Sequence, residues 1–151
     1  MSVYDLADAG LGSFDLVVLG SLLVHLRDPV RALDAVRRVT RGHLLAIEYL
    51  HTPLQILMGR QPLALLRGVG VDFQWWLPTD GAVRQMLSVG GFEVERVSKP
   101  FLLRLTSPPP APPTLRGRAR AQAVRLGNGI LTGDWRAQGH LHRAYLCRPR
   151  F

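Results

Sequence analysis

One segment near the start of the sequence constrains the fold more than any other. Leu16 to Gly20 is a short run of apolar and β-branched residues, which predicts a strand that is buried on both faces. Asp28 and Pro29 predict a helix start, because the carboxylate can cap free N–H groups and proline needs no donor in a first turn. His43 to Leu50 is a second apolar run. This order and spacing predict a βαβ unit with a right-handed crossover.

The rest of the chain continues the alternation of helices and strands. Capping residues, apolar spacing and glycine stops predict the following elements: a helix over Thr52 to Leu66 broken near Gly59 to Pro62, a helix from Thr79 or Asp80 to Gly90, a strand over Phe92 to Leu105 interrupted at Pro100, and a last strand over Leu141 to Arg148. The predicted fold is α/β, with a mainly parallel sheet of about four strands and flanking helices.

The C-terminal third has a different composition. Residues 1–106 are predicted to form a partial domain, 107–114 a proline-rich loop, and 115–151 a basic segment with the last strand of the same domain. A short helix is expected to carry Arg116, Arg118, Arg120 and Arg125, and Gly127 to Gly129 is predicted to be a turn. These arginines either contact phosphates or form a solvated basic surface.

Charge and cysteine content narrow the setting. The formal net charge is +8, and Lys99 is the only lysine. An acidic partner such as RNA or a phosphorylated metabolite suits this charge, although arginine-rich usage also follows from GC-rich codons. A single cysteine, Cys147, allows no disulfide within a monomer, and the apolar run Leu16 to Leu26 is shorter than the roughly 20 residues of a membrane helix. We therefore expect a cytoplasmic protein without a membrane partner.

The sequence FDLVVLGSLLVHLRDP, from Phe14 to Pro29, resembles the central strand and following turn of class I S-adenosylmethionine (SAM)-dependent methyltransferases. Three further segments resemble that family in the same order: Val3 to Leu6, Gly42 to Tyr49, and Trp76 to Phe92. The nearest branch resembles the wobble-uridine tRNA methyltransferases and their bacterial relatives. The resemblance covers roughly residues 3 to 105. It implies a Rossmann-like fold, SAM as cofactor, and methyl transfer to an acceptor that is a small molecule or RNA.

The glycine-rich loop that the family uses to hold the cofactor has no counterpart in this sequence. Gly10-Leu11-Gly12 is no substitute, because neither a strand before it nor a helix after it is predicted. We therefore expect a chain that corresponds to the C-terminal half of the family's fold and is inactive alone. Its first strand would be an open sheet edge, so self-association or pairing with a partner chain is expected. A non-catalytic binding module and an RNA-binding module are the alternative functions.

The resemblance implies a cofactor site at the end of the first strand, where open α/β sheets bind ligands. Gly20, Ser21 and Val24 would contact SAM, although a turn that needs small residues explains Gly20 and Ser21 equally well. Tyr4 and Asp5 would lie near the adenine, and Asp5 fits a solvated loop equally well.

Catalytic and substrate contacts are implied beside it. His25 would act as an acid or base or bind the substrate, and a histidine that ties down the turn is the alternative. Glu48, Tyr49 and Trp76 are candidate substrate contacts. Pairing of Glu48 with an arginine and burial of Trp76 in the core are the alternatives.

The His-x-His pair at 140 and 142, with Cys147 nearby, has two of the residue types that bind zinc. No second ligand cluster accompanies it in the sequence, so no metal is predicted. Cys147 is expected to be buried and inert.

Overall fold

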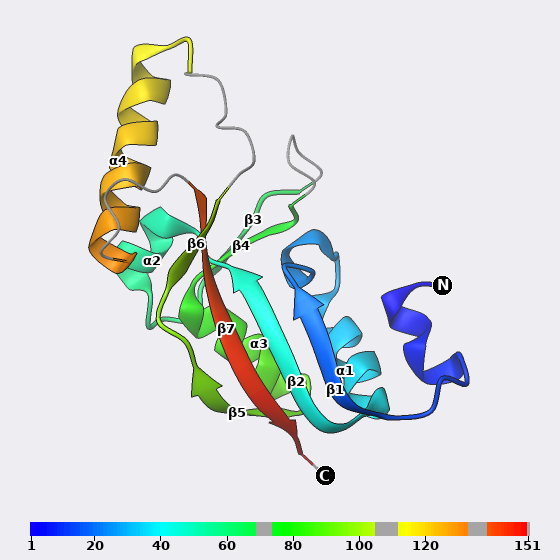
Figure 1. Ribbon diagram of the computed structural model, residues 1–151. Coiled ribbons are helices and arrows are strands. Elements are labelled where there is room, and N and C mark those ends of the chain that lie inside the picture. Colours follow the sequence, from blue (N-terminus) through cyan, green and yellow to red (C-terminus); the bar gives the residue numbers. More distant parts are fainter. Residues whose placement is uncertain (69–73, 105–111, 133–138, 151) are drawn as a thin grey trace.

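The computed structural model describes residues 1–68, 74–104, 112–132 and 139–150. Within those residues the main sheet has five strands (Figure 1). The order across the sheet is β1 (Phe14–Gly20), β2 (Thr40–Tyr49), β7 (Gly139–Pro149) and β5 (Phe92–Val97), and β6 (Phe101–Arg104) pairs with the other end of β7.

The α/β prediction with flanking helices is confirmed, and one detail of it differs. Only β1 and β2 pair in parallel, whereas β7 is antiparallel to β2, β5 and β6. The pairing is therefore mostly antiparallel rather than mainly parallel. The reason is that β7 lies between β2 and β5, which run in the same direction without touching.

One face of the sheet is covered by α1 (Pro29–Val39) and α3 (Asp80–Val89) (Figure 1). Local sequence explains both starts: the Asp28 side chain accepts a hydrogen bond from the Arg31 N–H at 3.0 Å, and Thr79 Oγ1 accepts one from the Ala82 N–H at 3.1 Å. The core under these helices is a cluster of buried apolar side chains, among them Leu33, Val36, Leu44, Val83, Leu87, Phe92 and Tyr145.

The opposite face of the sheet carries no helix in the part of the chain that the structure describes (Figure 1). On β1, Leu19 belongs to the core, whereas Leu16 and Val18 point the other way and are 57% and 56% exposed. Among the described residues β1 pairs only with β2. The first strand is therefore an edge strand with apolar side chains in solvent.

Most of the remaining elements gather beyond the carboxyl ends of β1 and β2 (Figure 1). They are α2 (Thr52–Met58), α4 (Leu115–Thr132), the short helix η2 (Leu23–His25), and the hairpin of β3 (Ala64–Leu66) and β4 (Trp76–Pro78). The predicted helix over Thr52 to Leu66 is wrong after its break, because Ala64–Leu66 forms the strand β3. Pairing of β3 with β4, with Leu65 opposite Leu77, outweighs the local preference there.

The predicted turn at Gly127 to Gly129 is also wrong, because α4 runs through it. Packing on α2 explains the difference. A Cβ at Gly127 would lie 2.4 Å from Ile56 Cδ1, so the two helices meet where α4 has no side chain. The Thr52 hydroxyl donates to Asn128 Oδ1 at 2.6 Å, and Asn128 Nδ2 donates to the Gly139 carbonyl. Tertiary contacts hold a glycine-rich segment helical.

Most of the proline-rich segment 107–114 lies outside the described residues. No helix among the described residues is both long and apolar enough to cross a membrane.

Candidate functional site

The chain leaves β1 through an unusual backbone conformation at Ser21. Its φ is +49°, and it is the only non-glycine residue with positive φ in the part of the chain that the structure describes. The Ser21 N–H donates to the Ile47 carbonyl at 2.6 Å, which fixes the turn to β2. Strained residues of this kind cluster at functional sites, so the carboxyl edge of β1 and β2 is a candidate functional site.

Ser21 forms a hydrogen bond with His142 on β7. Ser21 Oγ lies 2.8 Å from His142 Nε2, and His142 Nδ1 lies 2.8 Å from the His140 carbonyl oxygen. A carbonyl oxygen can only accept, so Nδ1 carries the proton and Nε2 accepts from the Ser21 hydroxyl. Burial lowers the pKa of His142 below its ordinary value, so this imidazole is neutral at pH 7. The pair places a basic nitrogen next to a hydroxyl.

Aromatic rings hold the imidazole of His142 in place. Tyr49, opposite His142 in the sheet register, meets it edge-on with centroids 5.9 Å apart. Phe101 from β6 stacks on it at 6.2 Å. Tyr49 is thus brought to Ser21 and His142, as a candidate substrate contact would need to be.

A second group contains Glu48, Val24 and Trp76, which line one small buried pocket. Glu48 is completely buried, and its Oε1 accepts a hydrogen bond from the Leu23 N–H at 3.3 Å. Its Oε2 has no partner among the described residues. Burial raises the pKa of Glu48 to about 8, so the carboxyl is mostly protonated at pH 7. Trp76 Nε1–H donates to the Leu26 carbonyl at 3.1 Å, which ties the hairpin to η2.

The other predicted residues lie around this edge. Tyr4 and Asp5 belong to η1 (Val3–Asp8), which packs against α1. The Tyr4 hydroxyl accepts a hydrogen bond from the Asp28 N–H at 3.3 Å, and Asp5 is exposed. Gly20 is exposed, and His25 is an exposed residue of η2.

Sequence reasoning missed the role of His142 as the partner of Ser21. Its only signal was the His-x-His spacing, which suggested a metal ligand. Cys147 lies five residues on, so it faces the helix-covered side of the sheet, opposite to His142, and burial raises its pKa to about 12. No group of three potential ligands is found among the described residues.

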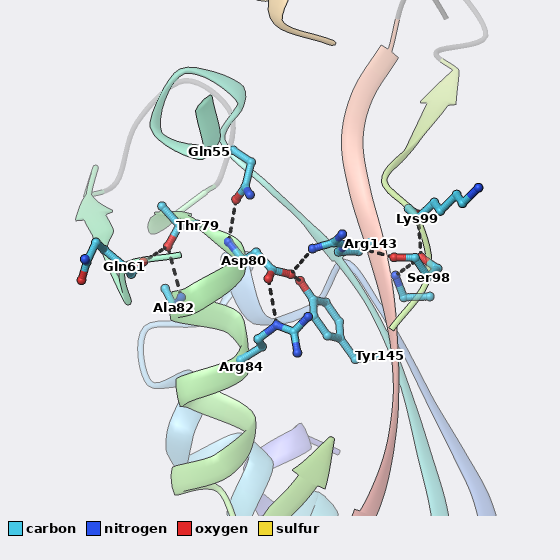
Figure 2. Close-up of polar contacts among 11 residues, drawn as sticks. Gln55, Gln61, Thr79, Asp80, Ala82, Arg84, Ser98, Lys99, Arg143 and Tyr145 are labelled. Carbon is cyan, nitrogen blue, oxygen red and sulfur yellow. Dashed lines mark hydrogen bonds and ion pairs between the residues drawn. The ribbon is translucent and has the colours of Figure 1, made fainter. Parts of the chain in front are cut away.

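A polar cluster around Asp80 at the start of α3 was also missed. Arg84 from α3 and Arg143 and Tyr145 from β7 converge on its carboxylate (Figure 2). The spacing of Asp80 and Arg84 was the only sequence signal, because the other two partners come from the last strand.

The basic segment is part of α4. Arg116, Arg118, Arg120 and Arg125 are all exposed on this helix. Helical spacing places Arg116 and Arg120 on one side of the helix and Arg118 and Arg125 on the opposite side.

The chain is similar in structure to known proteins. No protein-family model and no curated protein sequence matches the chain. Among solved structures, a SAM-dependent methyltransferase from Methanosarcina mazei is similar over 97% of this chain, with a TM-score of 0.55 and 12% identity. The [4+2]-cyclase SpnF is similar over 97% of this chain, with a TM-score of 0.54 and 14% identity. The chain spans 65% and 55% of the lengths of these two proteins.

These two similar proteins have names that describe different reactions, so the likeness concerns architecture. The α/β architecture with flanking helices agrees with the expectation from the sequence, whereas the mostly antiparallel pairing differs from it. The chain has the fold of the class I SAM-dependent methyltransferases.

Proposed function

We propose that the protein containing this chain transfers a methyl group from SAM to an acceptor at the carboxyl edge of β1 and β2. The observation that carries the proposal is the hydrogen bond between Ser21 and His142. It presents an unprotonated ring nitrogen and a hydroxyl at the edge where open α/β sheets bind their ligands.

The residues at this edge fit a bound cofactor. A Cβ added at Gly20 would meet no heavy atom within 4 Å, so there is open space beside the end of β1. The exposed carboxylate of Asp5 can accept hydrogen bonds from hydroxyl groups, and the half-buried ring of Tyr4 offers an aromatic surface. SAM, when bound, supplies an activated methyl group. The chain's own residues then have to orient the acceptor and remove its proton.

His142 is suited to accept that proton. Its Nδ1–H is held by the His140 carbonyl, which keeps the proton off Nε2. In the proposed reaction Nε2 takes the proton of the Ser21 hydroxyl as Ser21 Oγ takes the proton of the acceptor. Burial favours release of the proton afterwards, because it disfavours the charged imidazolium.

We further propose that the methyl acceptor is an RNA. The sequence resemblance to wobble-uridine tRNA methyltransferases favours an RNA acceptor, whose phosphates the exposed arginines of α4 could contact. A small-molecule acceptor is the alternative.

An NMR titration of the 151-residue chain with SAM tests the proposal. Saturating SAM is expected to shift the amide signals of Gly20 and Ser21. Gly20→Ala has room for its methyl group, so the fold should persist while SAM binds at least ten-fold more weakly. Asp34→Ala, on the exposed side of α1, is the matched control and should bind like the parent chain. The absence of any shift at Gly20 and Ser21 would contradict a cofactor site formed by the residues of this chain alone.

The role of His142 as the proton acceptor can be tested separately. Nitrogen NMR of His142 should find the ring neutral at pH 7 with its proton on Nδ1. A proton on Nε2 would remove the basic atom from the proposed reaction.

A second candidate function is supported by the edge strand. Leu16 and Val18 expose apolar side chains on β1, whose outer edge has no strand partner among the described residues. A binding module that pairs with another chain through β1 would use this surface.

A further inference from the structure

A cleft lies between α2, the loop that follows it, and the start of α3. Its volume is about 770 Å³, which falls within the range of small-molecule binding pockets. The carboxylate at the start of α3 and the arginines around it form the polar wall of this cleft (Figure 2). None of the residues in the proposed methyl-transfer site lines it.

The cleft has an excess of positive charge. Arg60, Arg84 and Arg143 line it together with one carboxylate, Asp80, so three guanidinium groups stand against one anion. Burial alone would raise the pKa of Asp80, but hydrogen bonds from Arg84, Tyr145 and Arg143 hold it below its ordinary value. Asp80 is therefore ionised at neutral pH and neutralises one of the three arginines. Two positive charges remain for a ligand.

Two of the three guanidinium groups, those of Arg84 and Arg143, are held in position by the protein. Arg84 Nε donates to Asp80 at 2.8 Å. Arg143 Nη1 lies 3.0 Å from the same carboxylate, and Arg143 Nε donates to the Ser98 carbonyl at 3.0 Å. A guanidinium has five N–H groups, so each arginine keeps donors that these contacts do not use. Fixed arginines lose little side-chain entropy when they bind an anion.

Arg60 completes the polar wall. It is exposed, and among the described residues it forms no hydrogen bond or ion pair. Beside it, Gln55 uses its Oε1 to accept the Asp80 N–H at 2.7 Å, which leaves the amide NH₂ as a donor. Gly81 is required here, because a Cβ would lie 2.6 Å from the Arg60 carbonyl oxygen.

The helix start itself offers no free donors to a ligand. The N–H groups of Asp80, Gly81, Ala82 and Val83 donate to Gln55, Gly59 and Thr79. Recognition in this cleft would therefore depend on side chains, mainly guanidinium groups. Guanidinium groups bind carboxylates and phosphates through paired N–H donors.

Apolar side chains also line the cleft. Leu57 and Met58 of α2 line the cleft and are 78% and 50% exposed. Apolar side chains of this size in solvent, next to an arginine cluster, suit a ligand that has both an anionic group and an apolar part.

We propose that this cleft binds a small organic anion, in which a carboxylate or phosphate group is attached to an apolar body. The anionic group would contact Arg60, Arg84 and Arg143, and the apolar body would lie against Leu57 and Met58. This proposal goes beyond methyl transfer and does not depend on it, because it concerns binding alone.

Titration of the 151-residue chain with hexyl phosphate and with hexanoate tests the proposal, followed by NMR. Either probe is expected to shift the amide signals of Gly59 and Gly81. The probe that binds more tightly shows whether the cleft prefers a phosphate or a carboxylate. Hexanol, which lacks the charge, and inorganic phosphate, which lacks the apolar body, should each bind at least ten-fold more weakly than that probe.

Two arginine variants make the test specific. Arg60→Gln should keep the fold, because the exposed Arg60 side chain has no partner among the described residues, and should weaken binding at least five-fold. Arg38→Gln removes the same charge from an exposed site on α1 and should leave binding unchanged.

Three outcomes would overturn the proposal. The first is equal affinity in Arg60→Gln and Arg38→Gln, and the second is hexanol binding as tightly as the anions. The third is the absence of shifts at Gly59 and Gly81 with either anion. Displacement of hexyl phosphate by a short single-stranded RNA at lower concentration would make RNA, rather than a small organic anion, the ligand of the cleft.

Discussion

The Tyr145 hydroxyl donates a hydrogen bond to the Asp80 carboxylate across 2.7 Å, and it joins the middle of the last strand to the start of α3. Tyr145 has no solvent exposure, and Asp80 is buried. Burial and the negative charge of Asp80 both favour the protonated phenol, so the pKa of Tyr145 is raised. The hydroxyl is therefore a permanent donor to a charged acceptor.

Tyr145→Phe should destabilise the fold by about 2 kcal/mol, because it removes a hydrogen bond to a charged group in a buried site. Urea unfolding measures the change. Tyr4→Phe removes a hydroxyl whose single hydrogen bond of 3.3 Å is exposed, and it should cost less than about 0.5 kcal/mol. Similar losses in the two variants would mean that the bond to Asp80 contributes nothing particular.

Glu48 should make stability fall as the pH rises. In the folded protein its pKa is about 8, whereas its ordinary value is 4.5. Unfolding between these pH values releases a proton, so the contribution of Glu48 is fully present below pH 4.5 and is lost as the pH rises towards 8. Thermal unfolding between pH 4 and pH 9 should therefore show that Glu48→Gln gains stability relative to the parent chain with rising pH.

The pKa values of His51 and His142 are lowered, so these two histidines make stability fall as the pH drops below 6.5. Both histidines are present in the parent chain and in Glu48→Gln, so their effect cancels in the stability difference between the two. A difference that does not change with pH would show that the folded-state pKa of Glu48 is ordinary.

Two glycines at opposite ends of the β1 and β2 pair should respond differently to alanine. At Gly42 a Cβ would lie 2.2 Å from the Asp15 carbonyl oxygen, which is backbone and cannot easily move aside. Gly42→Ala should therefore destabilise by about 1–3 kcal/mol. Gly20→Ala meets nothing within 4 Å and should change stability little. Chemical denaturation measures the free energy of unfolding of both variants. Equal losses in the two variants would contradict the register of this strand pair.

The exposed edge strand should make the chain self-associate. Val18→Lys places a charge on this edge and should lower the average mass in light scattering at high protein concentration. Val89→Lys makes the same change on α3, at a side chain that is 60% exposed, and should leave association unaltered. A parent chain that is monomeric at high concentration would contradict the proposed pairing through β1.

Local patterns were sufficient to predict the βαβ unit. The cap at Asp28 and the apolar spacing of α1 act within a few residues of one another, so the sequence reveals them. The extent of α4 could not be predicted, because the helical state of Gly127 depends on contacts with Thr52 and Ile56.

The candidate site was predictable only in part. The position of Ser21 follows from the end of a recognisable strand. Its partner His142 is 121 residues away, and the pair forms because β7 lies beside β2. No local pattern specifies that neighbour, and the cleft beside Asp80 depends on β7 in the same way through Arg143.

The position of β7 has a consequence for biosynthesis. A ribosome makes β2 and β5 well before β7, yet β5 has no neighbour in the sheet and β2 has only β1 until β7 emerges. Among the described residues, three of the four strand pairings in the main sheet include β7, so most of that sheet cannot form while the earlier strands are being translated. A nascent chain stalled before Gly139 would expose the edges of β1, β2 and β5 together, and it would be a natural client for chaperones that bind unpaired apolar strands.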